Sequence, residues 1–477
     1  MVFSSLLFIF AFLVPCMIIY TWVDDAKKNK VLLIFSLIFY SWGGPQYLIL
    51  LLADTFASWW FALQITRHRK NAKQYLIGEC IVLLGLLGIF KYTVFFCSNL
   101  QALIGIPKVI PQIVLPIGIS FYTFQLLSYV IDVYRKEVKA QPKFWKLLLY
   151  SSLFHQCIAG PIVRYETVAN EIDHRTISQK DIYEGIRRFC VGLAKKAILA
   201  NGCASVADTL LPFQQSALQS QAITGLWLGM LFYMLQIYLD FSAYSDMAIG
   251  MGRMVGFHYL ENFNYPYMAH SVQDFWRKWH ISLSTFFRDY VYIPLGGSRC
   301  SKGKYIRNMA IVWFLTGMWH GASWNYIFWG LYYLLFLLLE RFVYGNRLKP
   351  VWSHIYTLLV IYVGWIIFRF ENSSQLLTVL AGMIGIGNHA FTSMQVHTLF
   401  LENIFFLLFC IIACTYIGKG IRNGLYMIGK TNEIIYRLYT WGELLLPPVL
   451  LILSVLALIG NSYNPFLYFQ FEEGDRG

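Results

Sequence analysis

Two of the ten histidines in this largely apolar chain are the residues best suited to chemistry. His280 lies in the charged stretch QDFWRKWHISLSTFFRDYVYIPLGG, residues 273–297, and His320 lies in GMWHGASWN, between two apolar runs. A buried imidazole tends to stay neutral and can accept a proton, so His320 is suited to general-base catalysis. A core histidine that donates one hydrogen bond to a carbonyl is the alternative, although ionisable residues inside membrane segments are more often functional.

A second group of polar side chains accompanies the histidines. The apolar run 221–249 carries Asp240 and Asp246, so its helix must face protein or a cavity. It either lines a substrate route or bridges neighbouring helices, and both interpretations stay open. His280 alone is equally ambiguous, because a helix rich in Arg, Lys and Trp can hold a histidine for packing. The candidates for lining a substrate route are Gln236, Asp240, Tyr244, Ser245, Asp246, Trp276, Arg277, Trp279, Ser284, Arg288, Asp289, Trp319, Ser323 and Trp324.

A basic turn is the candidate for binding a cofactor's phosphates. Arg299, Lys302 and Lys304 flank a glycine turn, although a loop that only orients the protein in the membrane is the simpler explanation. The chain contains no HExxH or GxSxG motif, and GMGRMVG at 250–256 does not satisfy GxGxxG. No pattern indicates a metal site.

The segment around His280 has the signals of a helix with defined ends. Ser271 and Asp274 form an S-x-x-D capping box, which predicts a helix beginning at about Val272. The helix is expected to run through His280 and to stop before Pro294. It has no apolar side wide enough for lipid, so we expect it to lie against protein or a cavity.

Composition places these residues in a membrane protein. The chain has 477 residues, of which 57% are hydrophobic and only 13% are charged, whereas soluble domains carry roughly 25% charged residues. Apolar runs recur along the whole chain, and several reach the ~20 residues that a spanning helix needs. The sequence predicts an all-α polytopic protein with about 11 spans and further re-entrant or interfacial helices. We expect the chain to form one integral-membrane domain over residues 1–477.

The net charge of +13 reflects orientation and not nucleic-acid binding. Basic clusters at 27–30, 67–73 and 135–146 alternate with connections that carry almost no charge. This alternation predicts cytoplasmic basic loops and an extracytoplasmic N-terminus. Lys195 and Lys196 interrupt an apolar helical pattern at 191–210, which predicts an amphipathic helix in the interface with its lysines near lipid headgroups.

The chain resembles the membrane-bound O-acyltransferase (MBOAT) family. DFWRKWHISLSTFFRDYVYIPLGG and GMWHGASWNYIFWG carry the resemblance, together with LPIGISFYTFQLLSYVIDVYR, QCIAGPIVRY, LDFSAYSDMAIG and ENFNYPYMAHS. The match extends over essentially the whole chain and is strongest to bacterial alginate and peptidoglycan O-acetyltransferase membrane subunits. It implies the MBOAT fold, in which spans and slanted helices surround a central tunnel.

The resemblance also implies an activity. The family passes an acyl group from a cytoplasmic thioester to a hydroxyl. His320 matches the family's essential histidine and His280 its second histidine, so both are expected to be catalytic. We expect acetyl-CoA as the donor substrate, no tightly bound cofactor, and a separate extracytoplasmic SGNH-type protein that acetylates a cell-envelope polysaccharide. His320 is expected to deprotonate the acceptor hydroxyl, and His280 to position the reactants or hydrogen-bond the carbonyl oxygen.

Two alternatives to this activity remain. The first is D-alanyl transfer to teichoic acid from a carrier protein, within the same family. The second is a polysaccharide or lipid-linked sugar exporter without chemistry, although exporters often carry two similar halves, and this sequence shows none. In each case the expected location is the bacterial cytoplasmic membrane.

Overall fold

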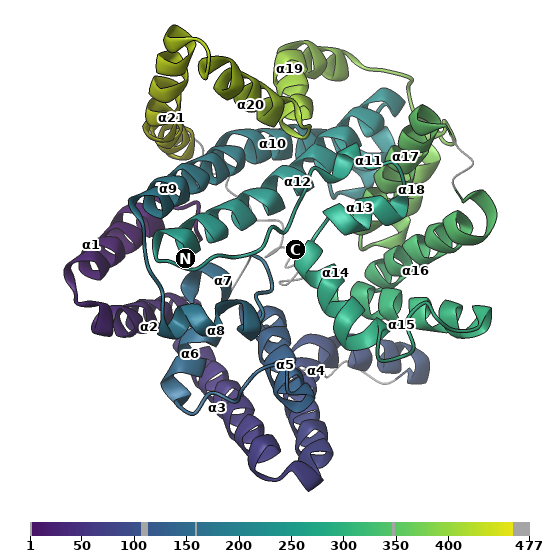
Figure 1. The fold of residues 1–477 in the computed structure, drawn as a ribbon. Helices are drawn as coiled ribbons and strands as arrows, with labels where there is room; N and C mark the ends of the chain where they lie inside the picture. The colour runs from purple at the N-terminus through teal and green to yellow at the C-terminus, as the bar shows by residue number, and fades with distance from the viewer. Residues whose placement is uncertain (1, 106–112, 158–159, 346–348, 461–477) are drawn as a thin grey trace. The chain divides into compact units, whose positions relative to one another are not determined.

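The computed structural model describes residues 2–105, 113–157, 160–345 and 349–460, which form helices joined by loops, with no strand among them (Figure 1). Within these residues, eight helices are long and apolar enough to cross a membrane. They confirm an all-α polytopic membrane protein, but the predicted number of about 11 spans is not confirmed. The candidate spans are Pro45–Arg67, Arg69–Ile104, Gln179–Leu210, Ile223–Met254, Trp324–Tyr344, Pro350–Arg369, Met394–Ala413 and Glu433–Gly460.

The described residues divide into two compact units. The first contains the chain up to Phe189 and residues 244–261, and the second contains 190–243 and 262–460. The prediction of one domain over residues 1–477 stays a prediction. The main helices of the first unit are α1 (Val14–Trp22), α2 (Asp25–Ser41), α3 (Pro45–Arg67), α4 (Ala72–Ile104), α5 (Ile119–Arg135), α6 (Phe144–Ser152), α7 (Phe154–Cys157), α8 (Tyr165–Asp173), most of α9 (Gln179–Ala194) and the end of α12 (Ile223–Met254).

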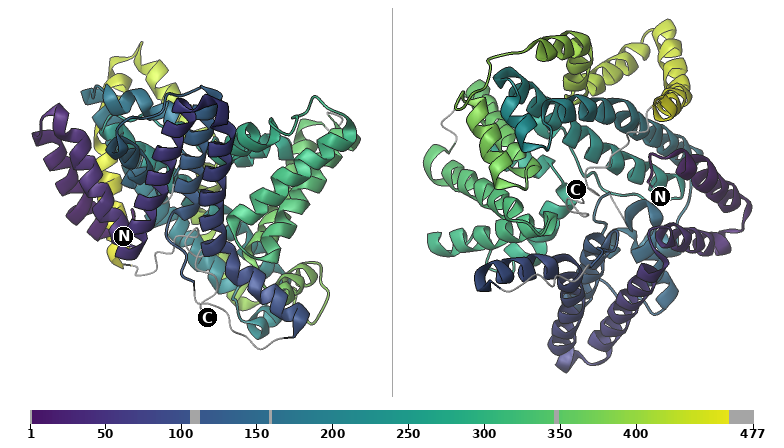
Figure 2. Two further views of the ribbon diagram at one scale, coloured as in Figure 1. Left: turned by 90° about the horizontal axis from the view of Figure 1, so that it is seen from below. Right: turned by 180° about the vertical axis from the view of Figure 1, so that it is seen from behind.

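In the first unit, α3 and α4 form a long hairpin whose helices lie side by side (Figures 1 and 2). Two apolar segments separated by a short basic turn produce this hairpin. Buried polar side chains in it find partners on neighbouring helices, as a low-dielectric environment requires. Thr55 lies 2.8 Å from Ser151 of α6, and Lys91 donates to Ser120 of α5 at 3.1 Å.

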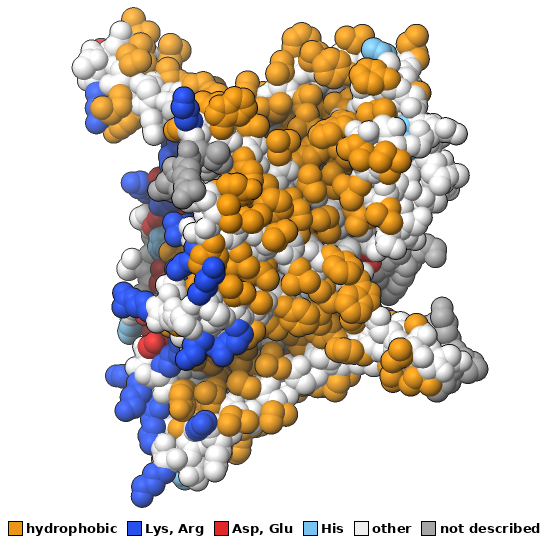
Figure 3. Space-filling model, turned by 90° about the vertical axis from the view of Figure 1, so that its right-hand side faces the viewer, with side chains coloured by type: hydrophobic (Ala, Val, Ile, Leu, Met, Phe, Trp, Pro, Cys, Tyr) orange, Lys and Arg blue, Asp and Glu red, His pale blue; other side chains and the backbone are white. Residues whose placement is uncertain are grey.

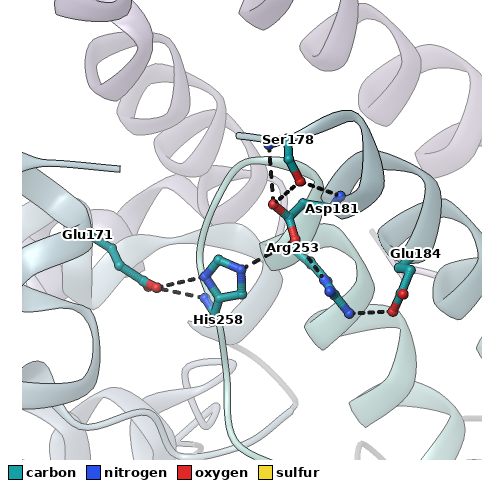
Figure 4. Close-up of polar contacts among 6 residues, drawn as sticks. All are labelled: Glu171, Ser178, Asp181, Glu184, Arg253 and His258. Atoms are coloured by element: carbon teal, nitrogen blue, oxygen red, sulfur yellow. Dashed lines mark hydrogen bonds and ion pairs between the residues drawn. The ribbon is translucent and has the colours of Figure 1, made fainter. Parts of the chain in front are cut away.

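A polar network in the first unit joins α8 and the start of α9 to the end of α12 and the loop after it (Figure 4). Nδ1 of His258 lies 2.8 Å from Oε1 of Glu171, and the backbone N–H of His258 donates to Oε2 of the same carboxylate. Arg253 donates to Asp181 at 3.2 Å and to Glu184 at 2.6 Å. These groups are partly exposed, so each pair contributes little alone, and the network serves to order the polar connection 164–189.

The second unit contains the remaining helices. α15 packs along α16, α16 packs against α17, and α20 forms a hairpin with α21 (Figures 1 and 2). The helices are α10 (Asn201–Leu210), α11 (Gln215–Ser220), the first part of α12, α13 (Val272–Lys278), α14 (Ile281–Phe287), α15 (Lys302–His320), α16 (Trp324–Leu339), α17 (Pro350–Arg369), α18 (Ser373–Met383), α19 (Met394–Ala413), α20 (Ile417–Gly429) and α21 (Glu433–Gly460).

The predicted interfacial helix at 191–210 is wrong. This segment belongs to a continuous helix, Gln179–Leu210, that is apolar enough to span a membrane and is largely buried in protein. Lys196 does not extend toward headgroups, because its side chain is 2% exposed and its Nζ lies 2.8 Å from Oδ1 of Asp240. The lysine interrupts the apolar pattern because it neutralises a buried acid on α12.

Several helices expose large apolar side chains, as helices in contact with lipid must. Phe405 on α19 is 83% exposed, and Trp352 on α17 is 63% exposed. Hydrophobic side chains cover the middle of the face drawn in Figure 3, and Lys and Arg side chains gather along its left edge. The acidic tail at 464–477 lies outside the described residues.

Candidate active site

His280 occupies a break between two short helices. The single helix expected from Val272 toward Pro294 is wrong, because α13 ends at Lys278 and α14 begins at Ile281. His280 has φ +44° and ψ 56°, a left-handed conformation that is rare for a residue with a side chain. Such strain persists only where the surroundings enforce it, and it is concentrated at functional sites.

The beginning of α13 is fixed by two caps. Ser271 accepts a hydrogen bond from the backbone N–H of Asp274 at 2.9 Å, which confirms the predicted start of the helix. Glu340, at the end of α16, accepts from the backbone N–H groups of Val272 at 2.6 Å and Gln273 at 3.0 Å. A carboxylate at a helix N-terminus satisfies unpaired donors and complements the helix dipole. The position of α13 is therefore tied to α16.

The side chain of His280 is buried among aromatic rings. It is 1% exposed, and its ring packs edge-on against Phe241, with 4.8 Å between the centroids. Nδ1 lies 3.3 Å from Oδ1 of Asn262, whereas Nε2 has no hydrogen-bond partner among the described residues. His280 lies outside the candidate spans, and burial lowers its pKa to about 3. The imidazole is therefore neutral at physiological pH.

His320 is the last residue of α15 and is also enclosed by aromatic rings. It is 8% exposed, and the rings of Trp319, Trp329 and Phe368 lie 5.0, 4.9 and 5.4 Å from its own. α15 and α16 approach closely here, since a Cβ on Gly330 would lie 2.3 Å from the carbonyl oxygen of Trp313. Glycine at this crossing allows the close approach that positions His320.

The ring of Trp319 packs against both histidines. Its ring lies 5.6 Å from that of His280 and 5.0 Å from that of His320. All three residues belong to the second unit. The rings of two histidines that are forty residues apart in the chain therefore both pack against the ring of Trp319.

Three further predicted residues, Trp276, Trp279 and Ser284, lie on or beside the two short helices that flank His280, and a fourth, Gln236, lies on α12. Trp276 packs against Trp329 at 5.4 Å, and Trp279 packs against Trp365 at 4.8 Å. Ser284 donates to the carbonyl of Trp276 at 3.2 Å, so its hydroxyl supports the break between the helices. Gln236 on α12 is 2% exposed, and its Oε1 has no partner in the described part of the chain.

The two acids of α12 form ion pairs. Asp240 pairs with Lys196, and Asp246 accepts from Arg188 at 2.9 and 3.1 Å. Tyr244 stacks on Phe3 at 5.5 Å. Asp246, Tyr244 and the buried Ser245 belong to the first unit, whereas Asp240 belongs to the second. These contacts match the interpretation that the polar residues of α12 bridge neighbouring helices.

The remaining predicted residues are more exposed. Arg277 is exposed, and Arg288 pairs with its neighbour Asp289 at 2.6 Å. Ser323 directly precedes α16, and Trp324 at its start is 51% exposed.

Arg299, Lys302 and Lys304 lie exposed at the first turn of α15 or just before it. His320 ends the same helix, so Lys302 and His320 are separated by about 27 Å at 1.5 Å per residue. A ligand that used both positions would have to be extended.

Asn262 and Glu340 are site residues that the sequence interpretation missed. Asn262 holds the ring of His280, and Glu340 holds the helix before it. Asn262 lies in ENFNYPY, a motif of the resemblance, but nothing in its local pattern connects it with a histidine eighteen positions later. Only the fold brings them together.

Comparisons with known proteins identify the family and several relatives of this chain. The model of a family described as the membrane-bound O-acyltransferase family matches residues 63–377. A probable alginate O-acetylase, AlgI, from Pseudomonas aeruginosa is 40% identical over 84% of this chain and 80% of its own length. A peptidoglycan O-acetyltransferase from Helicobacter pylori is 31% identical over 99% of this chain and 98% of its own. A teichoic acid D-alanyltransferase from Bacillus subtilis is 29% identical over 50% of this chain and 61% of its own.

Proposed function

Because this chain belongs to the membrane-bound O-acyltransferase family, we propose that it transfers acetyl groups from cytoplasmic acetyl-CoA toward hydroxyls of an extracytoplasmic polysaccharide. The observation that carries the proposal is the burial of His280 and His320 against one tryptophan, Trp319, in a single compact unit. Membership in an acyltransferase family argues against the exporter without chemistry. The full-length similarity to alginate and peptidoglycan O-acetyltransferases supports a polysaccharide acceptor.

The proposed reaction needs neither a metal nor ATP, because a thioester is already energised. His320 takes the proton of the acceptor hydroxyl while the oxygen attacks the thioester carbonyl. The carbon–sulfur bond then breaks, and the departing thiolate receives the proton from His320. The products are an acetyl ester and free coenzyme A, with no net release of a proton. An acetyl-histidine intermediate is a variant of the same scheme.

The donor would enter from the cytoplasmic side. Coenzyme A carries its phosphates at one end and its thiol at the other, joined by a long flexible arm. The donor would then contact both ends of α15, which are about 27 Å apart. Its phosphates would lie at Arg299, Lys302 and Lys304, and its thioester would lie at His320. This arrangement fits the predicted tunnel, in which donor and acceptor approach from opposite faces.

The acceptor side would require a second protein. We infer that the chain acts in a bacterial cytoplasmic membrane, with its N-terminus outside, and passes acetyl to a separate SGNH-type protein that modifies the polysaccharide. Copurification from the native host should recover such a protein. Repeated isolation of the active chain without it would contradict this part of the proposal.

D-alanyl transfer is the second candidate, favoured by the similarity to the teichoic acid D-alanyltransferase over half of the chain. Purified protein in nanodiscs is given either acetyl-CoA or a D-alanyl carrier protein, and acyl transfer is followed with each donor. Transfer from acetyl-CoA alone supports the proposal. Transfer from the carrier protein alone would replace it with the second candidate.

A further inference from the structure

The hydrogen on the His280 ring decides what His280 can do in the proposed reaction, on which this inference rests. A neutral imidazole carries hydrogen on one nitrogen and a lone pair on the other. With hydrogen on Nε2, His280 would donate to a carbonyl oxygen. With hydrogen on Nδ1, Nε2 would accept a hydrogen bond instead. The contacts of Nδ1 distinguish these two forms.

The amide of Asn262 faces His280 with its oxygen. The backbone N–H of Ser282 points at Oδ1 of Asn262 at 3.1 Å, and the Ser282 hydroxyl donates to the same atom at 2.9 Å. A backbone N–H can only donate, so the atom that receives it must be the amide oxygen and not the nitrogen. The orientation of Asn262 is therefore fixed by an unambiguous donor.

The same oxygen lies 3.3 Å from Nδ1 of His280. An amide oxygen can only accept, so Nδ1 must carry the hydrogen. The Ser282 hydroxyl, 3.4 Å from Nδ1, has one hydrogen, and its shorter contact with Asn262 uses it. Nε2 then carries the lone pair, and it is buried without a partner among the described residues.

We propose that Asn262 is a positioning residue that holds His280 as the Nδ1–H tautomer, so that Nε2 accepts a hydrogen bond from an O–H or N–H group of a substrate. His280 is consequently not the group that donates to the thioester carbonyl oxygen. Any stabilisation of negative charge on that oxygen comes from other donors.

The backbone around Asn262 supports a dedicated role. The carbonyl of Asn262 accepts from the N–H of Ile281 at 2.9 Å, and the N–H of Asn264 donates to the carbonyl of Lys278 at 2.9 Å. These two bonds bracket His280 and hold its left-handed conformation. Asn262 is fully buried, yet its Nδ2 has no partner in the described part of the chain. Leaving that donor unpaired is costly, so the residue is placed to present its oxygen and not to satisfy its own amide.

The ring is also protected from taking a second proton. Burial lowers the pKa of His280 to about 3, so a doubly protonated ring that could donate from Nε2 is rare near neutral pH. The rings of Phe241 and Trp319 around it supply no charge.

The test is nitrogen NMR on the full chain, labelled with ¹⁵N-histidine, in nanodiscs. Subtracting the spectrum of His280→Gln isolates the His280 signals. The expected wild-type signal has a protonated Nδ1 and a bare Nε2. Asn262→Leu should convert it to an Nε2–H form or a mixture, whereas the exposed Asn264→Leu should leave it unchanged. A wild-type signal with hydrogen on Nε2 would overturn the inference whatever the activity.

Kinetics separate a positioning role from a structural one. Asn262→Leu should lower kcat about 10- to 100-fold, the range seen when the partner that orients a metal-binding histidine is removed, with little change in KM. Asn262→Asp keeps an oxygen acceptor, so it should retain the Nδ1–H signal and shift the pH profile upward, since a carboxylate raises the pKa of the imidazole. If Asn262→Leu is not monodisperse, the spectra of the wild type and of Asn262→Asp still show which nitrogen of His280 carries the hydrogen. The Nδ1–H signal in a protein without acetyl transfer would refute the proposed function but not this inference.

Discussion

The crossing of α15 and α16 sets where His320 lies, and a single methyl group should displace it. A Cβ on Gly330 would lie 2.3 Å from the carbonyl oxygen of Trp313, and one on Gly317 would lie 2.4 Å from that of Tyr326. Carbon and oxygen need about 3.2 Å, which is shorter than the carbon–carbon optimum, so Gly330→Ala must separate the helices by about 1 Å. Both contacts involve rigid backbone, and no flexible side chain can move aside.

The expected consequence is a large loss of rate with a moderate loss of stability. Misplacing a reacting group by 1 Å can cost about 100-fold in rate, and overpacking typically costs about 1–3 kcal/mol. The assay measures acetyl transfer and the thermal midpoint of Gly330→Ala in nanodiscs. Gly424→Ala on α20 is the matched control, because nothing lies within 4 Å of its Cβ. Wild-type transfer by Gly330→Ala would refute the claim that this crossing positions His320.

Three further outcomes follow from buried or capping groups. Lys196→Met should lower the free energy of unfolding by about 3–5 kcal/mol, because it leaves Asp240 charged and buried. The double variant Lys196→Met/Asp240→Leu should recover most of this loss, measured by denaturant unfolding in micelles. Equal losses in the single and the double variant would contradict the pairing. In the same assay, Glu340→Ala should lower the free energy of unfolding by about 1–3 kcal/mol, because two N–H groups of α13 lose their acceptor. Glu340→Gln should lower it less. Identical losses in the two variants would exclude the helix cap. His155, buried outside the candidate spans, has a pKa lowered to about 3. Folding therefore favours the neutral form of His155. Its contribution to the free energy of unfolding is fully present above about pH 6.5 and is lost as the pH falls toward 3, at about 1.4 kcal/mol per pH unit. His155→Gln should flatten this slope, and an unchanged slope would show that His155 does not cause it.

The local signals in the sequence identified the start of α13 but not its end. The capping pair at Ser271 and Asp274 acts over three residues, so it can be recognised from the sequence alone. The break at His280 is enforced by Asn262 and by backbone bonds from a distant segment. A sequence without glycine or proline at that point gives no local sign of it.

Lys196 illustrates a second limit. A lysine in an apolar helix suits an interfacial position and a buried ion pair equally well, and the partner decides between them. Asp240 lies forty-four positions away, so its pairing with Lys196 depends on how α12 packs. The resemblance predicted catalytic roles for both histidines, but only the fold brings the ring of His280 to that of Trp319, the neighbour of His320 in the chain.

The most direct test of the central claim follows free thiol released from acetyl-CoA by the purified chain in nanodiscs, with acceptor or partner protein present. His320→Ala is compared with the wild type and with His397→Ala, which removes an exposed histidine of α19. All three proteins are first matched for monodisperse elution. The account predicts acceptor-dependent release that falls at least about 100-fold in His320→Ala and is unchanged in His397→Ala. Undiminished release by His320→Ala would remove His320 from the chemistry and contradict the account.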